Sequence, residues 1–357
     1  MREIKIVFHV GKQKTATSYI QKNIRSTSDL VFIGKLINSS DKKKFTGKIN
    51  NIHYDLFPKY HNYLRNSFYN PTRNSYSLIS HYAEQIVDII NSKPKVKQII
   101  ISDECISDYY NYLGEHNLFL IVTLGNLISK KLNSKVALTK VISFTIRNQL
   151  DIIKSFYSYN LFINKSFDNF LESIFVNKYS DFSGSLFYYE IYSMFKLITK
   201  NEWLIKLTPY EILSIENKPI FFIKEALCLS ENMMNCIIKD NLEIEINVTK
   251  NKSKSKSLIK KQFTTPLFKR ISILNTRLNY ENKYIKLPFY KLFFKKYLLP
   301  ILAFIDALFM KLFSKLLIRE YKLSERSKNK IYKIYKHDNK LLKELLLHYD
   351  LDKFGYL

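Results

Sequence analysis

The sequence has few of the residues that break or crosslink a chain: among 357 residues there are 7 Gly, 8 Pro and 3 Cys. So little Gly and Pro excludes a collagen-like chain and a Pro/Gly-rich disordered one. Cys105, Cys228 and Cys236 are odd in number and form no Cys-x-x-Cys pair. This pattern argues against a disulfide framework or a zinc site and favours a reducing compartment. We expect no metal site.

Long apolar runs are also missing. No stretch reaches the roughly 20 apolar residues that a membrane-spanning helix needs. The first ten residues, Met1–Val10, form too short and too charged a segment for a signal peptide. We therefore expect a cytoplasmic protein.

Acidic residues are scarce relative to basic ones. Asp and Glu number 31 and Lys and Arg 57, which gives a formal net charge of +26. Such a surface attracts phosphates, polyanions or anionic lipids, although a general bias toward Lys explains the same charge. No helix-turn-helix, zinc-finger or RNA-recognition signature is present, so we do not expect nucleic acid as a partner.

Strand and helix patterns alternate along most of the chain. Buried-strand patterns predict strands at Glu3–Val10, Ile99–Ile101, Val136–Ile146 and Trp203–Leu207. Apolar residues at helical spacing predict helices at Thr15–Arg25, Ser77–Asn91, Leu118–Leu132, Leu150–Asn160, Leu186–Ile198 and Ser324–Tyr349. The polar, basic run Asn247–Lys261 predicts a loop. The alternation indicates an α/β fold with a doubly wound, mostly parallel sheet flanked by helices.

The most informative segment is FHVGKQKTATS, from Phe8 to Ser18. A strand, a tight turn and then Lys-Thr-x-Thr-Ser at the start of a helix suit an anion, because the first backbone N–H groups of a helix lack intrahelical partners. Lys14 supplies a full charge, and Thr15, Thr17 and Ser18 supply hydroxyl donors. The segment is not a Walker A motif, since Gln13 and not Gly stands directly before Lys14-Thr15. An ordinary capped helix start remains the alternative.

A second anion motif lies about 130 residues farther along, in the run Val141–Tyr157. The predicted strand ends at Arg147, and Ser155 follows eight residues later on the next helix. An Arg at the carboxyl end of a parallel strand points toward the ligand crevice, and its planar guanidinium suits a phosphate monoester. A surface salt bridge for Arg147 and a solvent-facing Ser155 are the alternatives.

The first motif resembles the 5′-phosphosulfate loop of the sulfotransferase superfamily, above all bacterial members with a G-x-x-K-T-x-T-[ST] core. This chain has Ala16 where that family often has Gly. The resemblance implies a P-loop-like α/β domain that uses 3′-phosphoadenosine 5′-phosphosulfate (PAPS). It implies that Lys14 contacts the bridging or sulfuryl oxygens, and that the donor site includes Gly11, Thr15, Ala16, Thr17 and Ser18, with Thr15 to Ser18 around the 5′-phosphate.

The second motif is similar to the 3′-phosphate site of the same family, which implies that Arg147 and Ser155 bind the 3′-phosphate. Weaker similarities are a Tyr-Glu pair within Trp203–Leu213, an Asn-x-Ser loop at Asn251–Ser253, and a C-terminal stretch from Asp338 to Tyr356. Together they imply transfer of a sulfuryl group to an acceptor hydroxyl, with a glycan or glycolipid as the expected acceptor. The reaction needs no metal. We expect a domain over residues 1–260 and a helical C-terminal extension over 261–357, packed on that domain or continuing it.

The acceptor hydroxyl has to lose a proton, so a catalytic base is needed. Asp103 and Glu104 follow a buried strand, and the pair is similar to the Ser-x-Glu that bacterial sulfotransferases have after their second strand. Glu104 is the first choice for the base and Asp103 the alternate; a helix-capping acidic pair is the other interpretation. His9 competes because it ends the first strand, although it could equally pack or hydrogen-bond beneath the loop.

Two other functions fit parts of the sequence. A nucleotide or metabolite kinase with a divergent loop would explain the first motif, but the missing Walker Gly argues against it. A non-catalytic protein that binds membranes or polyanions would explain the net charge but neither motif. The segment from Phe289 to Lys322 is rich in Leu, Ile and Phe with interspersed Lys, and we expect it either to lie on a membrane surface or to form a core or dimer helix.

Overall fold

The computed structural model describes residues 2–10, 15–34, 74–102, 114–160, 167–175, 184–237, 258–261, 297–298, 300–301, 304–305 and 319–356. The chain forms two compact units. The first comprises Met1–Ile152, Ile174–Lys250 and Lys330–Leu357, and the second comprises Ile153–Ser173 and Asn251–Asn329. The sequence leads us to expect a single boundary at residue 260; the two units divide the chain differently.

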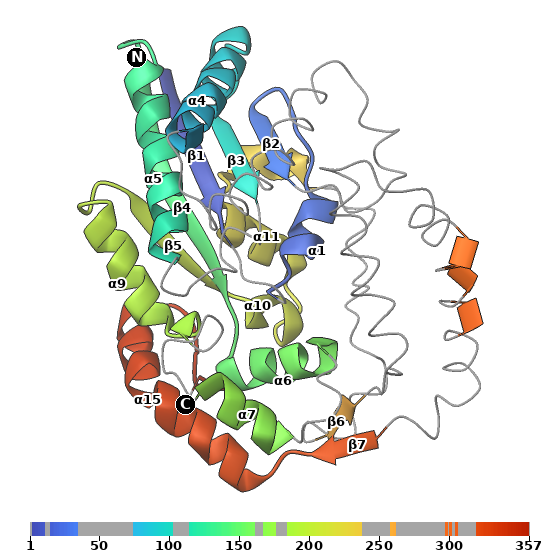
Figure 1. Ribbon diagram of the computed structural model, residues 1–357. Coiled ribbons are helices and arrows are strands. Elements are labelled where there is room, and N and C mark those ends of the chain that lie inside the picture. The colour runs from blue at the N-terminus through green and yellow to red at the C-terminus, as the bar shows by residue number, and fades with distance from the viewer. Residues whose placement is uncertain are drawn as a thin grey trace. The chain divides into compact units, whose positions relative to one another are not determined.

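The first unit is built on a sheet of five strands (Figure 1). The strands lie in the order β2 (Leu30–Gly34), β3 (Gln98–Ser102), β1 (Arg2–His9), β4 (Val136–Ile146) and β5 (Leu204–Pro209). Each neighbouring pair is parallel. The predicted α/β class is confirmed, and this sheet is wholly parallel.

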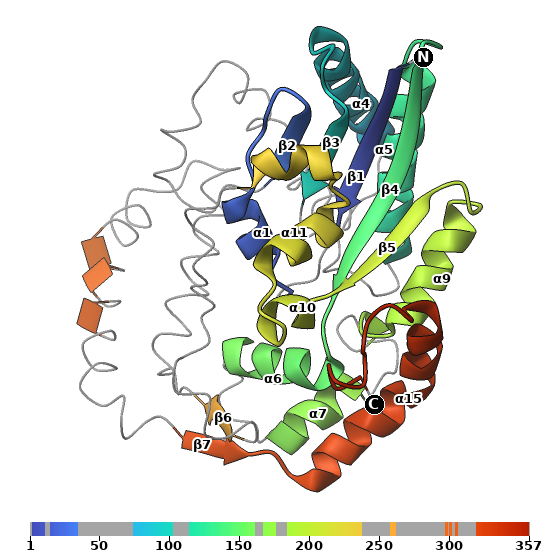
Figure 2. The same cartoon turned by 180° about the vertical axis from the view of Figure 1, so that it is seen from behind.

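Helices cover both faces of the sheet. α4 (Asn74–Ser92), α5 (Gly114–Lys131) and α9 (Tyr188–Ile198) lie on one face, and α1 (Thr17–Asn23) and α11 (Pro219–Leu227) lie on the other (Figures 1 and 2). A parallel sheet that is covered on both faces has strands that are apolar almost throughout. The strand β3 fits this rule, since each of its five residues is buried.

The remaining described elements are α6 (Gln149–Asn160), α7 (Phe167–Phe175), α10 (Glu211–Ser214), the 3₁₀ helix η2 (Glu231–Cys236), α15 (Glu325–Leu345), and an antiparallel pair of strands, β6 (Leu258–Lys261) and β7 (Arg319–Lys322). The loop predicted at Asn247–Lys261 is wrong at its end, because β6 occupies the last four residues. This strand exists only through its pairing with β7, which lies some 60 residues farther along the chain, and the local sequence does not show such a partner.

In the second unit, aromatic side chains from two helices form a buried cluster. Tyr157 of α6 lies with its ring 5.2 Å from those of both Phe167 and Phe170 of α7. Phe167 and Phe170 are themselves buried. The hydroxyl of Ser327 donates to the carboxylate of Asp168, which lies in the first turn of α7. These contacts tie α6, α7 and the start of α15 together within this unit.

On the face covered by α4, α5 and α9, the single Trp of the chain organises the packing. Trp203 is 1% exposed, and its ring stacks on Phe8 of β1 with 5.6 Å between the centroids. Gly125 of α5 lies against the same ring, so closely that a Cβ atom there would be 2.3 Å from Trp203 Cη2. Any side chain at position 125 would therefore push α5 away from the sheet.

The opposite face carries polar side chains that hold the C-terminal end of α11. The last carbonyl groups of a helix have no partner within it. Gln98 of β3 donates to the Leu227 carbonyl at 2.8 Å, and Ser143 of β4 donates to the Ala226 carbonyl at 2.5 Å. Both donors are buried, so these bonds replace water that the helix end cannot reach.

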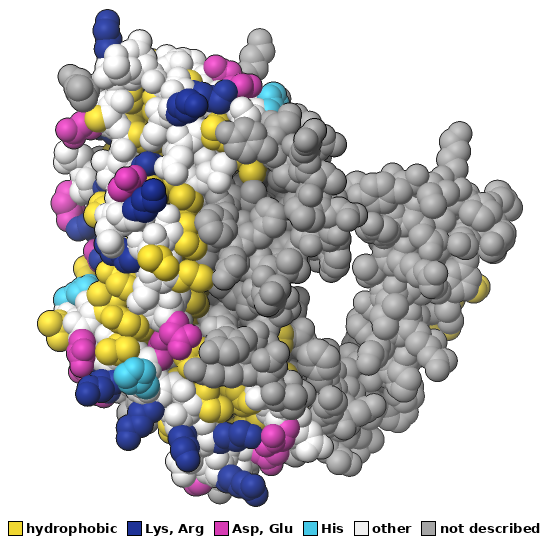
Figure 3. Space-filling view, turned by 60° about the vertical axis from the view of Figure 1, so that its left-hand side comes forward, with side chains coloured by type: hydrophobic (Ala, Val, Ile, Leu, Met, Phe, Trp, Pro, Cys, Tyr) yellow, Lys and Arg dark blue, Asp and Glu magenta, His cyan; other side chains and the backbone are white. Residues whose placement is uncertain are grey.

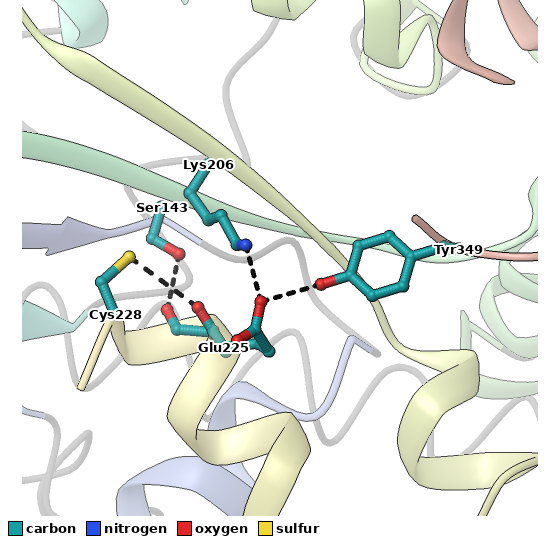
Figure 4. Close-up of polar contacts among 6 residues, drawn as sticks. Ser143, Lys206, Glu225, Cys228 and Tyr349 are labelled. Carbon is teal, nitrogen blue, oxygen red and sulfur yellow. Dashed lines mark hydrogen bonds and ion pairs between the residues drawn. The ribbon is translucent and has the colours of Figure 1, made fainter. Parts of the chain in front are cut away.

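Lysines from two further strands complete this attachment; Figure 4 shows the one on β5, Lys206. Lys5 of β1 donates to the Cys228 carbonyl at 3.0 Å. Lys206 of β5 pairs with the Glu225 carboxylate at 2.6 Å, and the Tyr349 hydroxyl donates to the same oxygen at 3.0 Å. Positive charge beside a helix C-terminus is stabilising, because the free carbonyl groups carry partial negative charge there.

Ser143→Ala should lower the free energy of unfolding by about 1 to 2 kcal/mol, because it leaves the Ala226 carbonyl buried without a partner. Ser134→Ala is the matched control. Ser134 is exposed in a turn and bonds only its neighbour Asn133, so its loss should change stability by less than about 0.5 kcal/mol. Urea unfolding measures both, and equal stabilities for the two variants would show that this hydrogen bond does not hold α11.

Candidate functional site

The loop that carries the first predicted anion motif lies between β1 and α1. Gly11 and Lys14 lie outside the described residues, and the side chain of Ser18 is likewise not described. Thr15 and Thr17 are buried at the start of α1. Both threonines of the motif therefore lie buried at the start of α1.

Ala16 adopts an unusual backbone conformation between these threonines. Its φ of 67° and ψ of 18° lie in the left-handed region. A Cβ atom costs about 1 to 2 kcal/mol in this conformation, whereas Gly adopts it freely. Ala16 holds this conformation here, at a position where Gly would hold it without that cost.

Thr17 contains a polar atom without a partner. Its Oγ1 is buried and has no hydrogen bond among the described residues. Leaving a hydroxyl buried and unpaired costs about 1 to 3 kcal/mol, and native structures contain few such groups. A ligand oxygen at the start of α1 would accept this hydrogen bond.

Beneath the loop, His9 joins three strands of the sheet. Its Nδ1 lies 2.9 Å from Ser102 Oγ of β3, and its Nε2 lies 2.9 Å from Thr145 Oγ1 of β4. Gln21 of α1 donates to the Ser102 carbonyl at 3.1 Å. The chain of polar contacts thus runs from α1 through β3 and β1 to β4.

The surroundings of His9 favour a structural role. The side chain is fully buried, and burial lowers its pKa from 6.5 to about 4. Both ring nitrogens are engaged with hydroxyl groups inside the sheet. This geometry supports the interpretation that His9 hydrogen-bonds beneath the loop, and offers no free nitrogen to an acceptor substrate.

The second predicted anion residue, Arg147, directly follows β4. Its guanidinium carbon lies 4.7 Å from the centre of the Tyr210 ring, in a cation–π contact. The Tyr188 hydroxyl donates to the backbone carbonyl of Arg147 at 2.6 Å. Both the side chain and the main chain of Arg147 are therefore held in place by aromatic residues.

A buried carboxylate supports the residue that follows. Glu211 Oε1 accepts the backbone N–H of Asn148 at 2.8 Å, and Oε2 accepts the Tyr356 hydroxyl at 3.1 Å. The amide of Asn148 also donates to the Gly355 carbonyl. Burial raises the pKa of Glu211 to about 7, although the Asn148 hydrogen bond and the charge of Arg147 favour the ionised form.

α15 contributes two further buried polar residues. Asp338 accepts the backbone N–H groups of Tyr189 and Glu190 at 3.1 Å each, so a residue distant in sequence caps the first turn of α9. Burial raises the pKa of Asp338 to about 6. Asn339 accepts a hydrogen bond of 2.7 Å from Gln149, which begins α6.

The Tyr210–Glu211 pair and the stretch from Asp338 to Tyr356 contact the chain where β4 ends and α6 begins. The sequence assigns them no chemistry, yet in the structure they surround the segment from Arg147 to Gln149. In the sequence, these residues stand out only as polar side chains within otherwise apolar stretches. Such a pattern indicates buried hydrogen-bonding groups, but it does not identify their partners.

Several predicted site residues cannot be related to this arrangement. Asp103 and Glu104, the predicted bases, lie outside the described residues, as does Asn251–Ser253. Ser155 lies on α6 within the second unit, where it is partly exposed. In the described part of the chain, no group of three or more His, Cys, Asp or Glu residues could hold a metal ion.

The ends of the central strands form the setting for a ligand site. The next described helix after β1, α1, lies on one face of the sheet, and the next described helix after β3, α5, lies on the other (Figures 1 and 2). Ligands of open α/β sheets bind where neighbouring strands diverge in this way, at their carboxyl ends. β4 is the other neighbour of β1, and the Val10 N–H donates to the Ser143 carbonyl of β4 at 2.8 Å.

Glu211→Gln should change how stability depends on pH. Because the folded protein raises the pKa of Glu211 from 4.5 to about 7, the folded state binds this proton more tightly than the unfolded chain does. The stability that protonated Glu211 contributes is therefore complete below pH 4.5 and is lost as the pH rises to 7. Relative to wild type, the variant should gain up to about 3 kcal/mol over this range.

Urea unfolding at several pH values measures this difference, and Glu202→Gln, at an exposed position, is the control for loss of a carboxylate. A stability difference between Glu211→Gln and wild type that stays constant from pH 4.5 to 7 would contradict the burial of a protonated carboxyl group.

Comparison with known proteins identifies no relative: no protein-family model, no curated protein and no solved structure matches this chain.

Proposed function

We propose that this protein is a sulfotransferase, which moves a sulfuryl group from PAPS to the hydroxyl group of an acceptor. The observation that carries the proposal is the pairing of β1 with β4. Each of these strands leads directly into one of the two phosphate motifs, and the motifs are about 130 residues apart in sequence. Parallel neighbours end at the same edge of a sheet, so the starts of both motifs lie close together.

The start of α1 supports the 5′-phosphate half of the site. Backbone N–H groups at a helix start attract anions, and the buried Thr17 hydroxyl lacks a partner among the described residues. Thr15 is buried beside it. A phosphate group is an acceptor of hydrogen bonds and carries the charge that such a helix start favours.

The surroundings of Arg147 support the 3′-phosphate half. Tyr210 stacks against its guanidinium group, while Tyr188 and Glu211 fix the adjacent backbone. An anion site gains affinity when its cation is held in position before the ligand arrives. The assignment of Ser155 to the same phosphate rests on the resemblance alone and stays a prediction.

The proposed reaction requires little covalent help from the protein. A bond forms between the acceptor oxygen and sulfur, the bond from sulfur to the bridging oxygen breaks, and 3′-phosphoadenosine 5′-phosphate leaves. Lys14 would stabilise the charge on the bridging and sulfuryl oxygens, and Glu104 would take the proton from the acceptor. A glycan or glycolipid is the proposed acceptor.

The surface charge does not by itself suggest a different function. On the face that Figure 3 shows, Lys and Arg side chains lie interspersed with Asp and Glu. A polyanion-binding surface needs basic side chains gathered on one face or along one stripe. α15 has an excess of basic residues, with seven Lys and Arg residues against three acidic ones, but polyanion binding explains neither phosphate motif.

Arg147→Ala should weaken binding of 3′-phosphoadenosine 5′-phosphate by at least about 100-fold, because a charge-assisted, bidentate contact with the 3′-phosphate is lost. Adenosine 5′-phosphate, which lacks that phosphate, should bind wild type and variant alike. Isothermal titration calorimetry measures both, with ATP as a third ligand and the exposed Arg326→Ala as the charge-matched control.

Equal affinity of wild type and Arg147→Ala for the bisphosphate nucleotide would refute the 3′-phosphate assignment. Preference of the wild-type protein for ATP in the presence of Mg²⁺ would favour a kinase instead.

Glu104→Gln should keep the affinity for 3′-phosphoadenosine 5′-phosphate and lower turnover by roughly 10²- to 10⁴-fold, the usual contribution of a general base. Asp103→Asn is the matched control, because it removes the neighbouring carboxylate. If Asp103→Asn shows the large loss and Glu104→Gln does not, the base is Asp103.

A further inference from the structure

Between Tyr297 and Ile305, the described residues of the second unit are helical, and five of them expose large apolar side chains. Of the segment from Phe289 to Lys322, the structure describes residues 297–298, 300–301, 304–305 and 319–322; the first three pairs appear as the separate orange helical pieces in Figures 1 and 2. Five of these residues are large, apolar and exposed by 42% to 68%: Tyr297, Leu298, Ile301, Phe304 and Ile305. We call these five residues the apolar stripe.

The spacing of the apolar stripe is that of one helix face. Its members stand at positions i, i+1, i+4, i+7 and i+8, which recur on the same side of a helix. In a soluble protein this is the side that packs against the core, and the exposed side is polar. Contiguous exposed apolar surface of this kind marks a site of interaction.

The charges around the stripe indicate what covers it. From Phe289 to Lys322 the sequence contains seven cationic residues, Lys291, Lys295, Lys296, Lys311, Lys315, Arg319 and Lys322, against two acidic ones, Asp306 and Glu320. A second copy of the chain would bring two such clusters of positive charge together. Anionic lipid headgroups would instead neutralise them.

The length of the stretch fits a surface position. Fourteen residues, Tyr297 to Met310, separate the flanking Lys296 and Lys311. A helix needs about 20 apolar residues to cross a bilayer, and within the described residues no helix is both long and apolar enough to do so. An amphipathic helix of this kind lies along the headgroup region with its apolar face toward the acyl chains.

We propose that the apolar stripe binds the surface of a membrane that contains anionic lipids. The large apolar side chains enter the boundary between headgroups and acyl chains, and the flanking lysines contact the headgroups. Membrane binding requires neither PAPS nor an acceptor substrate, so this proposal is separate from the sulfotransferase proposal. The narrower inference, that the acceptor is a lipid-linked glycan presented at the same surface, rests on the proposed function.

Vesicle flotation with the whole chain tests the proposal. The vesicles contain phosphatidylcholine alone, or phosphatidylcholine with about one third phosphatidylglycerol, at about 0.05 M and about 0.5 M salt. Wild type should float with the anionic vesicles at low salt and less so at high salt. A wild-type protein that stays at the bottom of the gradient under every condition would overturn the proposal.

Two variants separate the apolar and the ionic contributions. Ile301→Ser/Phe304→Ser should lower the partition coefficient by at least about tenfold at low salt, and Lys311→Gln/Lys315→Gln should reduce the salt dependence. Leu347→Ser is the matched control, because Leu347 is a large apolar residue, 85% exposed, on the first unit. Loss of binding in the control equal to that in the stripe variant would also overturn the proposal.

Sedimentation velocity without vesicles tests the alternative that a second copy of the chain covers the apolar stripe. A wild-type dimer that Ile301→Ser/Phe304→Ser converts to a monomer would assign the stripe to a second copy of the chain. Calorimetry with 3′-phosphoadenosine 5′-phosphate on the same variant keeps the two proposals apart. Membrane binding that fails while nucleotide binding succeeds contradicts only the inference made from the stripe.

Discussion

The hydrogen bond from the backbone N–H of Asn148 to the buried Glu211 carboxylate joins segments of the first unit that are far apart in sequence. It fixes the chain where β4 ends, directly beside Arg147. Tyr356, near the C-terminus, bonds the other oxygen of the same carboxylate. A carboxyl group in such surroundings is costly unless its oxygens are paired. Each partner of Glu211 is therefore needed, and together they join the sheet edge, α10 and the chain end.

Both faces of the sheet combine apolar packing with polar contacts. On the face of α4, α5 and α9, Trp203 packs against Phe8 while Lys140 lies over the same ring, and Arg2 donates to the Ile90 carbonyl near the end of α4. On the face of α1 and α11, polar side chains from the strands bond helix ends and each other. Buried hydrogen bonds of this kind fix geometry more strictly than apolar contacts do. On the face from which α1 begins, these bonds lie in the sheet beneath the proposed donor site.

The sequence predicts the elements whose pattern is long enough to be unambiguous. It predicts β4 with the bounds Val136–Ile146 that the structure has, because the run is long, apolar and rich in β-branched residues. It does not predict the five-residue edge strand β2 or the nine-residue helix α11, which are too short to show a period. It predicts that Thr15, Thr17 and Arg147 lie near the carboxyl ends of β1 and β4, but it does not predict which residues support them. Hydrogen bonds between residues 60 to 200 positions apart leave no local pattern.

The residues around Arg147 illustrate what a motif can encode. Arg147 is the cation that would meet a phosphate, whereas Tyr210 and Glu211 position it through contacts that exist without any ligand. A cation on a mobile strand end would lose conformational entropy on binding, and a positioned one has lost it already during folding. Positioning Arg147 instead lowers the stability of the folded protein, because it requires the buried carboxyl group of Glu211, whose pKa is raised to about 7. Under the proposed function, Arg147 is thus the ligand contact and Tyr210 and Glu211 are its supports, a distinction that only the three-dimensional arrangement makes visible.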